Sequence, residues 1–145
     1  MTAAHTTPTK ATTTIRSSYP RVWMITGASR GIGARIAEAA LAQGDAVVAT
    51  SRDAASVEKR LGPHDALLPL ALDVTDETQA RHAAGAALDR FGRIDVLVNN
   101  AGYGLLGAVE EATAEEVLRL YDTNVFGLLH VTRAVLPAMR ARRAG

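Results

Sequence analysis

Cysteine is absent from this chain of 145 residues, and the only lysines are Lys10 and Lys59. Disulfides, thiolate nucleophiles and cysteine–zinc centres are therefore excluded. Acidic and basic residues almost balance, with a formal net charge of +1 at pH 7, so the composition favours neither nucleic acid nor a membrane surface as a partner. No apolar run approaches the roughly 20 residues of a transmembrane helix. We therefore expect a soluble, cytoplasmic protein.

Several catalytic constellations are missing as well. The sequence contains no phosphate-binding Gly-Lys-Ser/Thr loop. The histidines lack metal-ligand spacing, so no metal site is expected; they are His5, His64, His82 and His130. With 48% hydrophobic residues, the chain has enough apolar side chains for the core of one domain.

Residues 1–20 differ in composition from the rest of the chain. Seven of them are threonine, none is acidic, and no apolar periodicity is present. We interpret this segment as a disordered tail, with the domain beginning at residue 21. The apolar core of a secretory signal is lacking. An organelle transit peptide is an alternative, because the segment has no acids and carries Lys10 and Arg16.

Apolar runs and helix-forming segments alternate from residue 22 onward. The expected strands are 22–26, 46–50, 67–72 and 94–98, and the expected helices are 31–43, 53–61, 76–90 and 114–141. Continuous apolar runs are typical of parallel strands buried on both faces. The alternation predicts an α/β fold, a doubly wound, Rossmann-like parallel sheet with the first four strands in the order 3-2-1-4.

The longest expected helix has a clear start. Thr113 and Glu116 form a capping-box pattern before it. Its apolar residues follow helical spacing, which predicts that most of them pack in the core. These residues are Val117, Leu118, Tyr121, Val125, Leu128, Leu129, Thr132, Val135, Leu136 and Met139.

A glycine turn between the first strand and the first helix carries the strongest functional signal. It reads Thr26-Gly27-Ala28-Ser29-Arg30-Gly31-Ile32-Gly33, with the spacing G-x-x-x-G-x-G. Free N–H groups of a helix N-terminus and the helix dipole favour an anion at such a turn. Gly31 and Gly33 would leave room for phosphates and for close helix–sheet packing. The sequence therefore predicts a pyrophosphate site at Gly27, Ser29, Arg30, Gly31, Ile32 and Gly33.

Four motifs together resemble the short-chain dehydrogenase/reductase family. They are the turn at 26–33, Asp73-Val74 after the third strand, Asn99-Asn100-Ala101-Gly102 after the fourth, and Asn124 in the long helix. The matches occur in the family's order and cover residues 22 to 143. The resemblance implies a nicotinamide cofactor and a small-molecule carbonyl or alcohol substrate.

The residues that follow the second strand indicate whether NAD or NADP is the cofactor. A carboxylate there would bind the ribose hydroxyl of NAD, whereas arginine suits the 2′-phosphate of NADP. The chain has Ser51 and Arg52 and no acid at these positions, and Arg30 would flank the same phosphate. The prediction is NADP rather than NAD. The alternatives are that both arginines are ordinary surface residues, or that Asp53 pairs with Arg52.

The resemblance implies further cofactor contacts. Asp73 and Val74 would hold the adenine, although Asp73 could instead cap the helix that begins near residue 76. Asn100, Ala101 and Gly102 would line the nicotinamide-ribose side, with Asn99 tying strand ends together. For the asparagines, simple turn chemistry is the alternative.

The family's catalytic pattern is present only in part. It consists of Tyr-x-x-x-Lys, a serine and an upstream asparagine, and this chain has only the asparagine, Asn124. We expect the N-terminal part of an oxidoreductase that is inactive as residues 1–145 and homo-oligomeric at full length. Its fourth strand would be an exposed edge, prone to association. The alternatives are a non-catalytic nucleotide-binding or dimerisation module and a degenerate product.

Overall fold

The computed structural model describes residues 18–145, so residues 1–17 of the segment 1–20 that we interpret as a disordered tail lie outside the described residues. The strands are β1 (Val22–Ile25), β2 (Ala46–Ser51), β3 (Leu67–Ala71) and β4 (Val96–Val98). The helices are α1 (Gly31–Ala42), α2 (Ala54–Leu61), α3 (Glu77–Phe91), α4 (Ala114–Tyr121) and α5 (Leu128–Arg142), with the π-helical segment η1 (Asp122–Gly127) between the last two.

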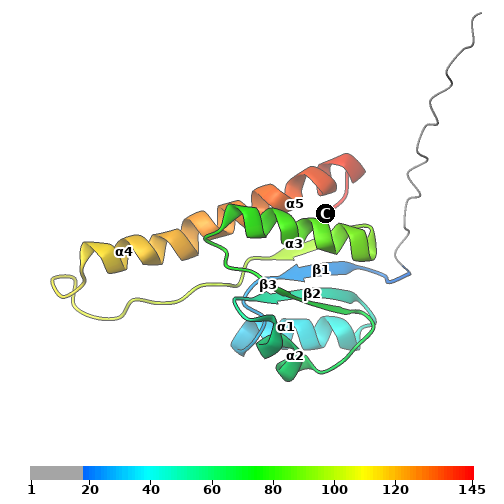
Figure 1. Cartoon of the computed structure of the whole chain (residues 1–145), viewed down its shortest axis with the longest axis horizontal. Helices are drawn as coiled ribbons and strands as arrows, with labels where there is room; N and C mark the ends of the chain where they lie inside the picture. Colours follow the sequence, from blue (N-terminus) through cyan, green and yellow to red (C-terminus); the bar gives the residue numbers. More distant parts are fainter. Residues whose placement is uncertain (1–17) are drawn as a thin grey trace, which may run out of the picture.

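The four strands form one parallel sheet in the order β3-β2-β1-β4, which confirms the predicted topology. Helices α1 and α2 lie on one side of the sheet, and α3 and α5 lie on the other (Figure 1). Within residues 18–145, β4 pairs only with β1 and lies at the edge of the sheet. Because all strands run the same way, the turns that follow them meet at one carboxyl edge of the sheet.

Each face of the sheet has its own hydrophobic core. Met24 of β1 packs with Phe91 of α3 and Val131 of α5, whereas the next residue, Ile25, packs with Ala37 of α1 on the opposite face. Successive side chains of a strand point to opposite faces, so a strand buried on both sides must be apolar throughout. This explains why the apolar runs predicted the strands.

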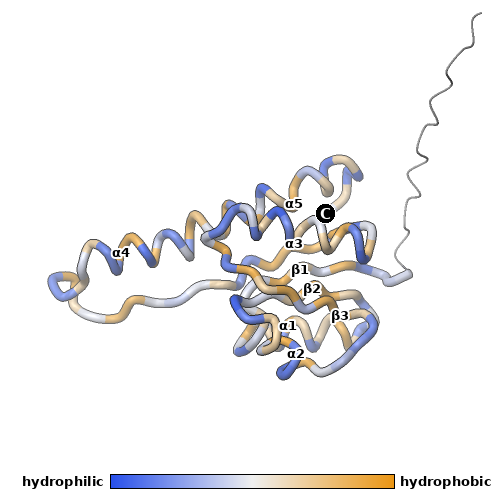
Figure 2. Tube along the Cα trace, in the orientation of Figure 1, coloured by the Kyte–Doolittle hydropathy of each residue, from blue (hydrophilic) through white to orange (hydrophobic). Residues whose placement is uncertain are grey.

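The long helix departs from the prediction in packing. Its capping box at Thr113 and Glu116 is confirmed, but α4 extends beyond the sheet (Figure 1). Apolar residues along this part therefore have little to pack against, and Figure 2 shows them on the protruding arm. The core expectation holds for Val135, which is buried, but is wrong for the exposed residues Val117, Leu118, Tyr121, Val125, Leu128 and Leu129.

Two carboxylates secure the amino edge of the sheet. Asp45 is 1% exposed and accepts hydrogen bonds from the Arg21 N–H (3.1 Å) and the Trp23 indole N–H (2.8 Å). Asp95 forms an ion pair of 3.0 Å with Arg142 near the end of α5. These bonds lie at the opposite edge from the glycine turn. Among residues 18–145, no helix combines the length and apolarity needed to cross a lipid bilayer.

Candidate functional site

A cleft of about 860 Å³ opens at the carboxyl edge of the sheet. The fold brings twelve of the thirteen predicted cofactor residues to its walls: Gly27, Ser29, Arg30, Gly31, Ile32, Ser51, Arg52, Asp73, Val74, Asn100, Ala101 and Gly102. The thirteenth, Gly33, is buried beneath the turn. The cleft is also lined by residues that were not predicted to bind the cofactor, although most of them adjoin a predicted site residue: Asp53, Ser56, Leu72, Thr75, Tyr103 and Thr123.

The glycine turn needs glycine for two physical reasons. Gly27 and Gly31 adopt φ angles of +67° and +58°, a region that side chains disfavour. A Cβ on Gly33 would lie 2.5 Å from both the Asn100 Nδ2 atom and the Gly27 carbonyl oxygen. A Cβ on Gly31 would meet no protein atom within 4 Å, so this position faces open space. A residue other than glycine would therefore be strained at Gly27 or Gly31, and the backbone at Gly31 leaves open space beside it.

The amino end of α1 faces this cleft without a protein cap. Its N-cap residue is Arg30, whose side chain makes no capping hydrogen bond, and its first turn holds no acidic residue. The first N–H groups of a helix need acceptors, and the dipole makes this end electropositive. The site thus combines free backbone N–H donors, the Arg30 guanidinium and the bare backbone of Gly31. This combination suits the binding of a phosphate group.

Thr26 and Asn100 fix the turn to the end of β4. The Thr26 hydroxyl oxygen accepts from the backbone N–H groups of Asn100 and Ala101, both at 3.0 Å. The Asn100 side-chain amide donates to the carbonyls of Thr26 (2.9 Å) and Gly27 (3.1 Å). The Asn100 amide group is thus engaged in shaping the turn. Thr26 was not predicted as a site residue, although it opens the glycine motif.

The segment after β2 is held by local hydrogen bonds. The hydroxyls of Ser51 and Ser56 each donate to the Asp53 carbonyl at 2.6 Å, so Ser51 must rotate its hydroxyl to donate to a ligand. The Asp53 carboxylate caps α2 by accepting from the Ala55 N–H (3.1 Å). Within residues 18–145, no ion pair joins Asp53 to Arg52, which is exposed on the cleft wall.

Asp73 does not cap α3, so that alternative is wrong. Asp76 is the N-cap, accepting from the N–H groups of Thr78 (2.8 Å) and Gln79 (3.0 Å). The hydrogen bond from the Gln79 N–H is the main reason that the pKa of Asp76 lies below its ordinary value. The Asp73 carboxylate instead accepts from the Thr75 N–H (3.0 Å) and hydroxyl (2.8 Å), which orders the cleft wall.

Asn124 lies in η1 and is bonded to the loop that follows β4. Its Oδ1 atom accepts from the Tyr103 N–H (3.1 Å), and its Nδ2 atom donates to the Tyr103 carbonyl (2.7 Å). A Cβ on Gly102 would lie 3.0 Å from Asn124 Oδ1, so the loop passes very close. Asn99 donates to the Thr132 hydroxyl (3.0 Å), which ties the end of β4 to α5 rather than to another strand.

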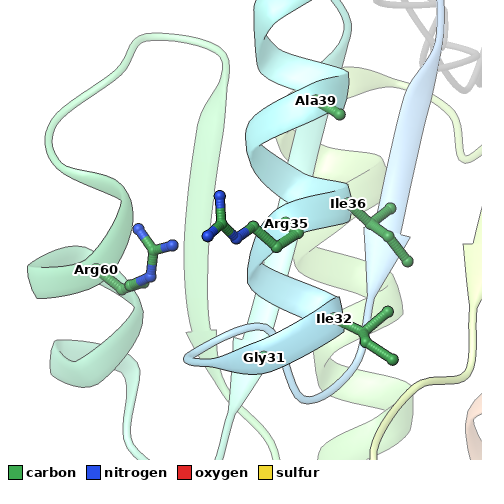
Figure 3. A pocket seen from close by; sticks show the side chains of 6 residues that line it. All are labelled: Gly31, Ile32, Arg35, Ile36, Ala39 and Arg60. Atoms are coloured by element: carbon green, nitrogen blue, oxygen red, sulfur yellow. The ribbon is translucent and has the colours of Figure 1, made fainter.

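A second, smaller hollow of about 580 Å³ lies beside α1 and shares only Gly31 and Ile32 with the cleft. Figure 3 shows the side chains of Arg35 and Arg60 near one another beside α1. Both arginines contact the Glu38 carboxylate, so neither charge is unopposed. Residues 18–145 contain no cluster of three potential metal-ligating side chains.

Comparisons with known proteins agree with this geometry. A family model described as short chain dehydrogenase matches residues 21–145. Oxidoreductase BOA17 of Botryotinia fuckeliana is 41% identical over 127 residues, which is 86% of this chain and 46% of that protein. The chain belongs to the short-chain dehydrogenase family. It spans about half the length of such relatives.

Solved structures of the family show the same fold. A short-chain dehydrogenase from Streptomyces avermitilis has a TM-score of 0.83 and 45% identity, covering 89% of this chain and 48% of that one. A 3-ketoacyl-(acyl-carrier-protein) reductase from Brucella melitensis, complexed with NADH, has a TM-score of 0.81 and 36% identity over 86% of this chain and 52% of its own. A metagenomic short-chain oxidoreductase in complex with NADP has a TM-score of 0.77 and 36% identity over 86% and 59%.

Proposed function

We propose that this chain is the cofactor-binding part of an NADP-dependent oxidoreductase that acts on a small-molecule carbonyl or alcohol. The single observation that carries the proposal is the cleft at the carboxyl edge, where the uncapped amino end of α1 adjoins the glycine turn. Phosphate binding at such a turn is the basis of dinucleotide recognition in parallel α/β sheets. When bound, the nicotinamide ring supplies or accepts the hydride.

In this proposal each wall of the cleft binds one part of the dinucleotide. The N–H groups at the start of α1 hold the pyrophosphate, and the bare backbone at Gly31 allows it to approach. Asp73 and Val74 bind the adenine side. Ala101 and Gly102 bind the nicotinamide-ribose side, with their backbone set by the Thr26 and Asn124 contacts.

The preference for NADP rests on Arg30 and Arg52. Both are exposed residues of the cleft wall, and within the described chain neither takes part in an ion pair. A planar guanidinium binds a phosphate with two parallel hydrogen bonds. No acidic residue stands at Thr50 or Ser51 to bind the ribose hydroxyl of NAD. Solved relatives hold either NADH or NADP, so the arginines are the basis of this choice.

The chemistry of turnover requires a proton donor beside the substrate oxygen. We propose Asn124 as the family's helix asparagine, acting through its bonds with the Tyr103 backbone. None of the tyrosines Tyr19, Tyr103 and Tyr121 is followed by lysine four residues later. Residues 1–145 alone should therefore hold nucleotide at most and catalyse no hydride transfer.

Titration of the protein that contains this chain with NADPH and NADH, followed by nicotinamide fluorescence, tests the proposal. We expect tighter binding of NADPH. Arg52→Ala should weaken NADPH binding about 10- to 100-fold, because a charge-assisted hydrogen bond contributes about 1.5–3 kcal/mol. NADH binding should change little. Arg133→Ala, an exposed arginine on α5, is the matched control. Equal affinity for both nucleotides in the unaltered protein would refute the NADP preference.

A dimerisation role is the second candidate, favoured by the exposed apolar residues of the protruding helix. Leu118 is 69% exposed, Tyr121 53% and Phe126 51%. Isolated exposed apolar side chains are common, but a row of them on one arm favours an interface. We propose a homo-oligomer at full length. Light scattering of Leu118→Glu should then show a smaller particle than the unaltered protein, and an unchanged mass would refute this surface.

A further inference from the structure

The long helix contacts Val74, although the two are far apart in the sequence. It lies between β3 and α3, is 7% exposed and lines the cleft. The Nδ1 atom of His130 on α5 is 3.2 Å from the Val74 carbonyl oxygen. A carbonyl only accepts hydrogen bonds, so His130 must carry a proton on Nδ1 to donate it. This bond connects residues 56 positions apart in sequence.

A second residue of the long helix, Gly127, also packs against Val74. Gly127, one turn before His130, is buried at the end of η1. A Cβ on Gly127 would lie 2.6 Å from Val74 Cγ2 and 3.2 Å from the Val74 carbonyl carbon. The helix backbone therefore touches Val74 directly.

The other hydrogen bonds of this cleft wall come from nearer elements. The Leu72 N–H donates to the Ser51 carbonyl (2.8 Å) on β2, and the Asp73 N–H donates to the Gln79 side chain (2.9 Å) on α3. Among the hydrogen bonds of residues 18–145, the bond from His130 is the one that connects residues 72–75 to α5. It thus fixes this wall relative to α5, which continues from the η1 segment that carries Asn124.

We propose that His130 is a positioning residue for the adenine side of the cleft, acting through its hydrogen bond to the Val74 carbonyl. The inference rests on the proposed nucleotide-binding function. If residues 72–75 are already held in their binding position, no conformational entropy is lost in ordering them when the ligand binds, and the ligand therefore binds more tightly.

The test uses the protein that contains this chain and two probes for the two ends of the cleft. Adenosine 2′,5′-bisphosphate carries the adenine and the 2′-phosphate, and nicotinamide mononucleotide carries neither. His130→Leu should weaken bisphosphate binding about 2- to 10-fold, the range of one net hydrogen bond. Mononucleotide binding should stay unchanged. His130→Asn keeps an amide donor near the Nδ1 position and should restore binding to within about 2-fold. His82→Leu, on the exposed side of α3, is the matched control.

Amide hydrogen exchange of the ligand-free protein adds a readout that is independent of nucleotide. Exchange over residues 72–76 should quicken in His130→Leu and return toward the unaltered rate in His130→Asn. Unchanged bisphosphate binding by His130→Leu would overturn the inference. An equal loss for both probes that His130→Asn fails to restore would also overturn it, because general destabilisation acts at both ends. A protein that binds neither probe before mutation would refute the proposed function itself.

Discussion

Replacing Gly33 with alanine tests the packing of the glycine turn. Gly33 is the third residue of α1, where alanine would normally raise helix stability by about 1 kcal/mol. Here the added Cβ would lie 2.5 Å from the Gly27 carbonyl oxygen and 2.5 Å from Asn100 Nδ2. Helix preference alone predicts that Gly33→Ala is more stable, whereas the close contacts with Gly27 and Asn100 predict that it is less stable.

The steric effect should outweigh the helix preference. Overpacking a tight contact costs typically about 1–3 kcal/mol. If Asn100 moves away, its bonds to the Thr26 and Gly27 carbonyls (2.9 and 3.1 Å) are lost as well, at about 1 kcal/mol each. After the gain of about 1 kcal/mol in helix preference, we expect a net loss of about 2–4 kcal/mol in the free energy of unfolding.

Gly85 provides a matched control within the same fold. It lies inside α3 with nothing within 4 Å of an added Cβ. Gly85→Ala should therefore stabilise the protein by about 0.5–1 kcal/mol through helix preference and a restricted unfolded chain. The two substitutions are chemically identical, so their difference isolates the contact with Asn100 and Gly27.

Urea denaturation followed by circular dichroism measures both changes. The midpoint should fall for Gly33→Ala and rise for Gly85→Ala at a similar dependence on urea. NADPH binding should weaken in Gly33→Ala, because the first turn of α1 must move. A Gly33→Ala protein as stable as the unaltered one, with intact binding, would refute this account of the turn.

Three further changes test other parts of the fold. Gly127→Ala should destabilise by about 1–3 kcal/mol by pushing on Val74, and adding Val74→Ala should recover part of this loss in urea denaturation. The pKa of Asp76 lies below its ordinary value of 3.8, so the ionised carboxylate stabilises the fold above that pH, and this contribution is lost as the pH falls through the lowered pKa. Asp76→Asn should therefore lower the thermal midpoint at neutral pH, and its difference from the unaltered protein should disappear in acid. Asp45→Ala should cost about 2–4 kcal/mol, because the Trp23 indole N–H and a backbone N–H lose a buried acceptor, and an unchanged melting temperature would contradict this role.

The sequence by itself determined the order of elements, the parallel sheet and most of the cleft wall. Apolar runs predict strands because a strand buried on both faces has no polar face, and the structure has the expected order β3-β2-β1-β4. The predicted site residues follow strand ends, and the ends of parallel strands must meet at one edge. The capping box at Thr113 and Glu116 was equally readable, because a cap is a contact between near neighbours.

Tertiary structure alone decided what packs against what. The spacing of Leu118 and Tyr121 is that of a core helix, yet both are exposed, because periodicity identifies an apolar face and not its partner. The bond between His130 and Val74 spans 56 residues, and no local pattern encodes a contact made only when two helices and a strand end have docked.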